Sequence, residues 1–467
     1  MRHLHVAELR DSWSAWLGVS IAFVVTNLAL AVSALALLAS VTAIESGALD
    51  GYDSTALAIV PGINFVFCAV IGTVVIGFST SLVVDSRRGS LARLALSGAT
   101  PGQVVSTMMS QLAAVSLACS LVGGLLAFAA LRPALRLLAH GQGEGTPAPE
   151  PVYAVWPVLV AGLFAVGLAL VGGFKQARRA SRIPPVEALR QSGVASGQRM
   201  TVVRWVGVVV CLLVLVAAFR AVPQLTADPA ADTLSSVVQA GLGLLVVTAV
   251  LLALLAPAVV GPLTRGWTLL VPPFDPSWQL SRSTAVVKAA RLAKSVVPVM
   301  MTIGLLFGML ALGQIFQASI AATGDDTRLT AAGVSSTLVF LGSPLAIALA
   351  GGVGSLVMMS KQRDAELALT GIVGTTPAQR VAMPVLEGVI IAVTGALLAV
   401  VMVAVPIGFL AVGLPAAGFA FAFSPDYVAF ALAFVVALAV TVAATLLPTL
   451  ASLRRPEPRV IARLVAE

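Results

Sequence analysis

Ten long apolar runs dominate the 467-residue sequence and limit what it can fold into. About 30 Å of hydrocarbon is spanned by about 20 helical residues, so each run is long enough to cross a bilayer. The runs are residues 14–44, 58–84, 103–131, 153–174, 203–222, 235–264, 296–319, 336–360, 382–412 and 427–453. Only 10% of the residues are charged, against roughly a quarter in soluble domains. The sequence therefore predicts an all-α membrane protein with about ten transmembrane helices.

The positive charges predict which way the chain crosses the membrane. With the N-terminus in the cytoplasm, 24 of the 28 Lys and Arg residues fall in cytoplasmic segments. The exceptions are Arg132, Arg136, Arg220 and Arg328. Acidic residues divide evenly between the two sides, so the bias belongs to the cations alone, as the positive-inside rule requires. Both termini are predicted to be cytoplasmic, and the net charge of +8 then indicates membrane topology and no nucleic-acid partner.

A segment between apolar runs occurs twice. DSRRGSLARLALSGATPGQVV at 85–105 matches KQRDAELALTGIVGTTPAQRV at 361–381 at a constant spacing of 276 residues. The identical pairs are Arg87 and Arg363, Leu91 and Leu367, Ala92 and Ala368, Gly98 and Gly374, Thr100 and Thr376, Pro101 and Pro377, Gln103 and Gln379, and Val105 and Val381. Both copies follow an apolar run and precede another, and their polar composition makes a chance match of apolar helices an inadequate explanation.

The repeat divides the chain into four, two and four spans. A weaker echo pairs residues 178–190 with residues 452–464, after the fourth and the tenth span. The predicted division is therefore a first four-span repeat at 1–191, two intervening spans at 192–266, and a second four-span repeat at 267–467. Both repeats have the same orientation, which predicts a parallel duplication.

Each repeated segment is predicted to form a short amphipathic helix along the cytoplasmic surface. In the first copy Leu91 and Leu94 share one helical face, while arginines can reach water or phosphate. Gly98 and Gly374 suit the end of such a helix, and the prolines three residues later suit the start of the next span. This shape favours transmission of force from a cytoplasmic partner; the alternative is an anchor on anionic lipid.

The repeated pattern of a charged segment, an apolar helix and G-x-T-P-x-Q-x-V resembles the FtsX-like (MacB-like) permease family of ATP-binding cassette (ABC) transporters. The segment ARRASRIPPVEALR at 177–190 resembles the same family. The resemblance implies that each copy is a coupling helix, which seats in a groove of a separate ATPase. The residues so implied are Arg87, Arg88, Leu91, Arg93, Leu94 and Gly98 in the first copy, and Arg363, Glu366, Leu367 and Gly374 in the second. Glu366 matches the family's usual acidic residue, where the first copy has Ser90.

The resemblance also implies a function. The chain would be the permease subunit of an ABC transporter that exports or extracts an apolar or amphipathic substrate, such as an antimicrobial peptide, a lipid or a drug-like molecule. The sequence contains no G-x-x-x-x-G-K-[ST] motif, so ATP and Mg would be bound by a partner ATPase, expected in two copies. This chain is expected to bind no cofactor or metal of its own and to lie, with membrane lipid around it, in a bacterial cytoplasmic membrane.

Two other functions stay open at this stage. A secondary transporter generally places charged side chains in mid-membrane, and the predicted spans carry none at their centres. A non-transporting FtsX-like protein would pass the state of an ATPase to an external partner. The loops at 45–57 and 320–335 are too short for the large extracytoplasmic domain usual in the family, which argues against a docked external enzyme.

Polar and small residues inside the runs are predicted to serve packing. Asn27, Asn64, Gln111, Gln239 and Gln314 can form hydrogen bonds between helices. Gly351, Gly352 and Gly354 are predicted to let two helices approach closely, and Cys68, Cys119 and Cys211 to be small packing residues. Residues 2–13 and 275–294 are predicted to be amphipathic lead-in helices before the first span of each repeat.

Overall fold

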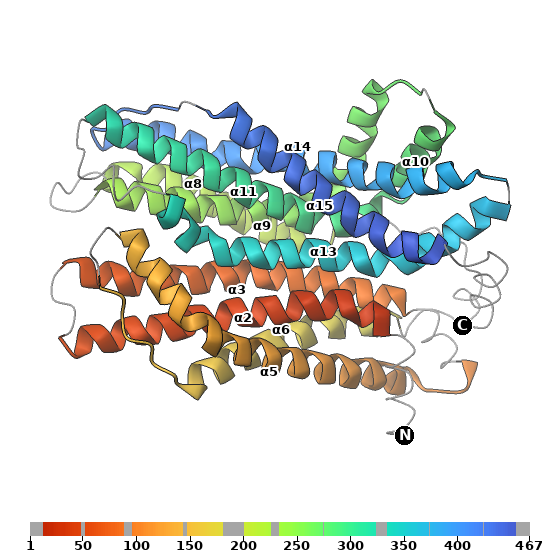
Figure 1. Cartoon of the computed structure of the whole chain (residues 1–467), viewed down its shortest axis with the longest axis horizontal. Helices are drawn as coiled ribbons and strands as arrows, with labels where there is room; N and C mark the ends of the chain where they lie inside the picture. Colours follow the sequence, from red (N-terminus) through yellow and green to blue (C-terminus); the bar gives the residue numbers. More distant parts are fainter. Residues whose placement is uncertain are drawn as a thin grey trace.

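The computed structural model describes residues 13–47, 52–87, 96–142, 147–180, 200–225, 233–273, 275–323, 334–372, 374–423 and 425–453 (Figure 1). Across these ranges the only regular structure is helical. The ten helices there that are long and apolar enough to cross a membrane are α2 (Trp13–Glu45), α3 (Tyr52–Ser86), α5 (Pro101–Gln142), α6 (Val155–Ala180), α8 (Val202–Leu225), α9 (Thr233–Leu270), α11 (Ala289–Thr323), α13 (Val334–Ile372), α14 (Pro377–Ala416) and α15 (Tyr427–Leu453). The predicted all-α fold with ten spans is confirmed.

The exposed surface of the bundle is aliphatic. Helix α8 exposes large apolar side chains such as Leu213, at 63%, whereas α11 buries Val296 and Met300 completely. A soluble protein rarely exposes a continuous apolar surface of this kind, because water does not solvate it favourably. Hydrocarbon does, so the exposed faces are those of a multi-pass membrane protein.

Two groups of four helices pack in the same way. In the first unit (α2, α3, α5 and α6), α2 contacts the other three helices, and α6 also packs against α3 and α5. In the second unit (α11, α13, α14 and α15), α11 contacts the other three, and α15 packs against α13 and α14. Each helix of one unit thus has a counterpart with the same neighbours in the other. This agreement supports the predicted duplication, while the exact boundaries of the repeats stay a prediction.

The correspondence extends to single residues. In the first unit a methyl group at Gly123 of α5 would lie 3.1 Å from the backbone nitrogen of Leu28 in α2. At the 276-residue spacing these positions become Ala399 of α14 and Gly304 of α11, and a methyl at Gly304 would lie 3.5 Å from the Ala399 Cβ atom. The glycine is on the third helix in the first unit and on the first helix in the second unit, but the same two positions are in contact. The repeat in the sequence is therefore a repeat in packing.

The two intervening spans pack mainly against the second unit. Helix α9 packs against α11 and α14, and α8 packs on the outside of α9. Helix α9 also reaches α3 of the first unit. Between the units, α13 packs against both α2 and α3. Figure 1 shows the two units as layers, the first in red to yellow and the second in green to blue.

Helix α5 is longer than predicted. It continues to Gln142, eleven residues beyond the apolar run that was predicted to end at residue 131. Leu131, Leu135 and Leu138 are buried, whereas Arg132 and Arg136 are exposed. This spacing is that of an amphipathic helix, whose charged face hides it from a search for continuous apolar runs. The helix therefore does not end with the apolar run at residue 131.

The connections at the other ends of the spans are short. Residues 46–51 join α2 to α3, and residues 324–333 join α11 to α13. Segments of this length cannot bury a core of their own. The predicted departure from the family, the lack of a large domain at these two points, agrees with the helix bounds.

The predicted lead-in segment at 275–294 is divided between two helices. Helix α10 (Pro276–Val287) begins at Asp275, whose carboxylate accepts a hydrogen bond from the Ser277 backbone nitrogen at 3.2 Å, and ends at Lys288. Its buried face includes Trp278, which lies 6.2 Å from Trp267 of α9 between ring centroids. A separate amphipathic helix before α11 is thus confirmed, but residues 289–294 belong to α11. The predicted lead-in helix at residues 2–13 lies almost wholly outside the described residues.

Candidate functional site at one end of the bundle

The described parts of the two repeated segments lie at one end of the bundle. Because the ten spans alternate in direction, α3 and α13 end where α5 and α14 begin, at the right-hand end of Figure 1. Helix α2 begins and α15 ends there as well. We call this the motif end. The described parts of both copies of the repeated segment therefore lie at the same end of the molecule.

The first copy of the motif forms a tight turn that starts a new helix. Gly98 has φ +94°, a left-handed conformation that favours glycine. The Thr100 backbone nitrogen donates to Gln103 Oε1 at 2.9 Å, and the Gln103 backbone nitrogen donates to Thr100 Oγ1 at 3.4 Å. This reciprocal pair is a capping box, and Pro101 is the first residue of α5.

The second copy forms the same turn. Gly374 has φ +104°, and the hydrogen bonds between Thr376 and Gln379 measure 3.0 and 3.3 Å. On its other side the Thr375 backbone nitrogen donates to the Thr370 carbonyl at 3.2 Å, as in a Schellman motif that ends a helix. Each G-x-T-P-x-Q motif is therefore a restart turn (residues 98–103 and 374–379). The predicted role of Gly374 at a helix end and of the two prolines at helix starts is confirmed. The helix that Gly98 was predicted to end lies almost wholly outside the described residues.

Arg87 points into the bundle rather than away from it. The residue is 5% exposed, its guanidinium donates to Gln111 Oε1 of α5, and its Cζ atom lies 5.8 Å from the centroid of the Trp16 ring of α2. These contacts join the end of α3 to two neighbouring helices through a charge-assisted hydrogen bond and a cation–π contact. A direct role for Arg87 in docking stays a prediction.

The segment before the second restart turn differs from what was predicted. Helix α13 continues without a break to Ile372, so the expected separate surface helix is absent from this described segment and that prediction is wrong. No Gly or Pro interrupts residues 355–370, and the charged residues there are good helix formers that let the helix continue beyond the apolar run. Arg363, Glu366 and Leu367 are placed by their backbone on the last three turns of α13.

The remaining predicted docking residues are not placed by the structure. Arg88, Leu91, Arg93 and Leu94 lie outside the described residues. Their docking role, like that of the second copy, stays a prediction. What the structure establishes at the motif end is the pair of restart turns and the helices that they join.

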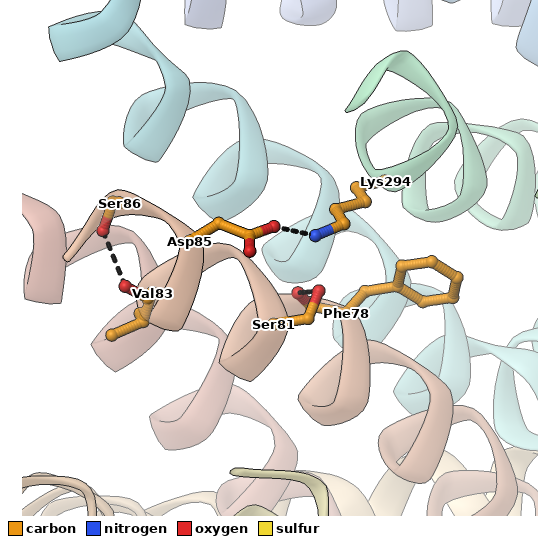
Figure 2. Close-up of polar contacts among 6 residues, drawn as sticks. All are labelled: Phe78, Ser81, Val83, Asp85, Ser86 and Lys294. Carbon is orange, nitrogen blue, oxygen red and sulfur yellow. Dashed lines mark hydrogen bonds and ion pairs between the residues drawn. The ribbon is translucent and has the colours of Figure 1, made fainter. Parts of the chain in front are cut away.

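An ion pair at the motif end was missed in the sequence. Lys294 of α11 binds Asp85 of α3, and their side chains are 8% and 27% exposed. Figure 2 shows the lysine extending from α11 to the last turn of α3. Lys294 was counted only as a cytoplasmic cation, although opposite charges at corresponding ends of two spans are a signal for such a pair. The pair joins the first unit to the second.

Polar residues inside the spans join helices, as predicted for most of them. Asn64 of α3 accepts from Ser33 of α2 at 3.0 Å and donates to the Val339 carbonyl of α13 at 2.6 Å. Asn27 Nδ2 donates to the Ser120 carbonyl at 2.7 Å. Gln111 accepts from Arg87, and Gln314 Oε1 accepts from the Asp426 backbone nitrogen at 3.5 Å. The prediction is confirmed for these four residues and stays a prediction for Gln239.

The glycines of α13 allow close helix packing, as predicted. A methyl group at Gly354 would overlap the carbonyl oxygen of Gly18 in α2, and one at Gly351 would overlap Val75 of α3. At Gly352 a methyl would meet ordinary contacts, the nearest 3.7 Å away. Small residues at such positions let helix backbones approach closely in a membrane.

The comparison with known proteins supports this description. The family model for the FtsX-like permease C-terminal domain matches residues 62–185, from within α3 to just beyond α6. No curated protein matches the chain. The matched segment contains the first restart turn, most of α3, and all of α5 and α6. Residues 62–185 therefore match the FtsX-like permease family, and the resemblance inferred from the repeated motif is confirmed.

Proposed function

We propose that this chain is the permease subunit of an ABC transporter and works with a separate ATPase that binds at the motif end. ATP and Mg would be bound by that partner. The observation that carries the proposal is the pair of restart turns, which have the same geometry and lie at the same end of two similarly packed units. The match of residues 62–185 to the FtsX-like permease family supports it.

Two equivalent turns suit two copies of one partner. A symmetric ATPase dimer would present two equal surfaces, and each could contact the segment just before one restart turn. In the first copy this segment carries Arg88, Leu91, Arg93 and Leu94, and in the second it carries Arg363, Glu366 and Leu367. Docking by these residues, with Arg87 nearby, is part of the proposal.

Force would pass from the docked ATPase into the spans. The second docking segment is the end of α13 itself, so a push on residues 361–372 acts on a helix that packs against α2 and α3 of the other unit. Arg87 joins the first docking segment to α2 and α5 in a similar way. Closure of two ATPase subunits would then move the two units relative to each other.

The substrate class follows from the surfaces available. The connections at 46–51 and 324–333 leave no room for an external domain, so substrate would meet the helices themselves. Their exposed faces are aliphatic, as at Leu213 and Leu163. We therefore propose that an apolar or amphipathic molecule, such as a lipid, a drug-like compound or an antimicrobial peptide, is exported or extracted from the membrane. The cation bias in the sequence supports a bacterial cytoplasmic membrane with the motif end and both termini in the cytoplasm.

The test is a pull-down of the tagged chain in mild detergent. Wild type is compared with Leu91→Asp, Leu367→Asp and the double variant, each of which puts a charge on a proposed docking face. Wild type is expected to recover a protein with a G-x-x-x-x-G-K-[ST] motif, identified by mass spectrometry. The double variant is expected to lose it.

The matched control is Leu49→Asp, the same substitution in the connection between α2 and α3 at the opposite end. It is expected to recover the ATPase as well as wild type does. Equal recovery by all variants, with each chain monodisperse in size-exclusion chromatography, would show that these segments do not bind the ATPase.

A further inference from the structure

The two units meet at two places that the repeat makes equivalent. At the 276-residue spacing, Gly18 of α2 corresponds to Lys294 of α11, and Gly354 of α13 corresponds to Phe78 of α3. Gly18 meets Gly354 where α2 crosses α13. A symmetric molecule would repeat that contact where α11 approaches α3, so the two places can be compared position by position.

A contact between α3 and α13 supports treating these two places as equivalent. Val75 of α3 and Gly351 of α13 also correspond at this spacing, and a methyl at Gly351 would overlap the Val75 side chain. Two equivalent positions that contact each other lie on a local twofold axis, because each then occupies its partner's place. The axis passes where α3 packs against α13, and the two places lie on either side of it.

The place where α2 crosses α13 is closed. A methyl group on either glycine would overlap the other glycine's carbonyl oxygen, so the two backbones are in direct contact. We call this the glycine crossing. The contact is made by backbone atoms of the two glycines, so no rotamer change of either residue can open it.

At the equivalent place, α11 and α3 are farther apart and are linked by an ion pair. Lys294 and Phe78 stand where the first place has two glycines, and Figure 2 shows both side chains between α11 and α3. Few contacts join α11 directly to α3, and α9 packs against both helices. The ion pair of Lys294 with Asp85 links them.

We propose that the two units turn about the glycine crossing and that the Lys294–Asp85 pair is a latch that opens on the other side. Lys294 is the third residue of its span and Asp85 lies one residue before the end of its own, so both charges are close to the membrane surface. Water can reach separated charges there, whereas in mid-membrane their separation would cost far more. The ion pair can therefore separate with both of its charges hydrated.

The latch deepens the proposed function, because ATPase closure at the motif end would act on it, but its test needs no ATPase. Spin labels are placed at two exposed positions, Ser86→Cys next to Asp85 and Val287→Cys at the end of α10, just before α11. They report the distance between the two units at the latch side. A second pair at Ile21→Cys and Leu349→Cys reports the distance between α2 and α13. Distances are measured by pulsed electron paramagnetic resonance in lipid nanodiscs, with the three native cysteines replaced by serine.

Lys294→Met is expected to raise the share of a longer distance across the latch by about tenfold, since couplings between sites are typically 5- to 150-fold. The α2–α13 distance is expected to stay unchanged. Asp85→Asn gives the same test if Lys294→Met is not recovered folded. Exchange of both charges, Asp85→Lys with Lys294→Asp, is expected to restore the short distance. Lys288→Met removes an equal charge six residues earlier and is the control.

Two results would overturn the proposal. An unchanged latch distance in both neutral variants would show that the ion pair does not hold the units together. Lengthening of both distances in parallel would show that the units do not turn about the glycine crossing. Neither result depends on whether an ATPase binds, so failure of the latch and failure of the proposed function can be told apart.

Discussion

The two four-helix units have the same internal packing, but the two contacts between them differ. Inside each unit the corresponding helices pack together, and the same restart turn begins the third helix. Between the units, one crossing is a contact of two glycines and its counterpart carries Lys294 and Phe78. The comparison teaches that two copies of one fold can meet through one fixed contact, the glycine crossing, and one contact that can open, the latch. The two contacts differ in only a few side chains.

The largest effect is expected at the glycine crossing. Gly354→Ala places a methyl against the Gly18 backbone, which cannot move aside as a side chain could, and we expect a loss of about 3 kcal/mol in unfolding free energy. Unfolding in mixed detergent, followed by circular dichroism, measures it. Gly77→Ala is the control, because its methyl would meet nothing within 4 Å. Equal stability of the two variants would remove the distinction between the fixed contact and the contact that can open.

A smaller loss is expected at the latch. Lys294→Met removes the ion pair of Lys294 with Asp85, and we expect a cost of about 2 kcal/mol, less than for a fully buried pair because Asp85 is partly exposed. The charge-exchanged double variant should recover most of this loss in the same unfolding measurement. No recovery would mean that the local surroundings, rather than the pair, set the energy.

The two restart turns should respond equally and modestly. Thr100→Ala and Thr376→Ala each remove a capping hydroxyl, and we expect a cost of about 1 kcal/mol for each. Thr→Ser keeps the hydroxyl and serves as the control at both positions. A cost in one copy alone would show that the two turns, despite their equal hydrogen bonds, are not equivalent in stability.

Much of this fold follows from the sequence, because hydrocarbon demands long apolar helices and these are visible as runs. The restart turns could also be predicted, since Gly98 and Pro101 act locally on the backbone. The lengths of the helices were harder to predict from the sequence. The end of α5 and the end of α13 are amphipathic or charged, and a helix that leaves the hydrocarbon no longer shows as an apolar run.

The candidate site was only partly predictable for a different reason. The direction of Arg87 depends on Trp16 and Gln111, which lie on other helices. The ion pair of Lys294 with Asp85 joins residues 209 positions apart. Pairing across such a distance is decided by how the units pack, which a local pattern does not encode.

The most direct test of the central claim counts ATPase subunits on the permease by native mass spectrometry. The account predicts two ATPase copies on wild type, one on Leu91→Asp, one on Leu367→Asp, and none on the double variant. Two copies on every variant, with each permease still folded, would contradict the claim that the two repeated segments are the sites at which an ATPase drives this membrane protein.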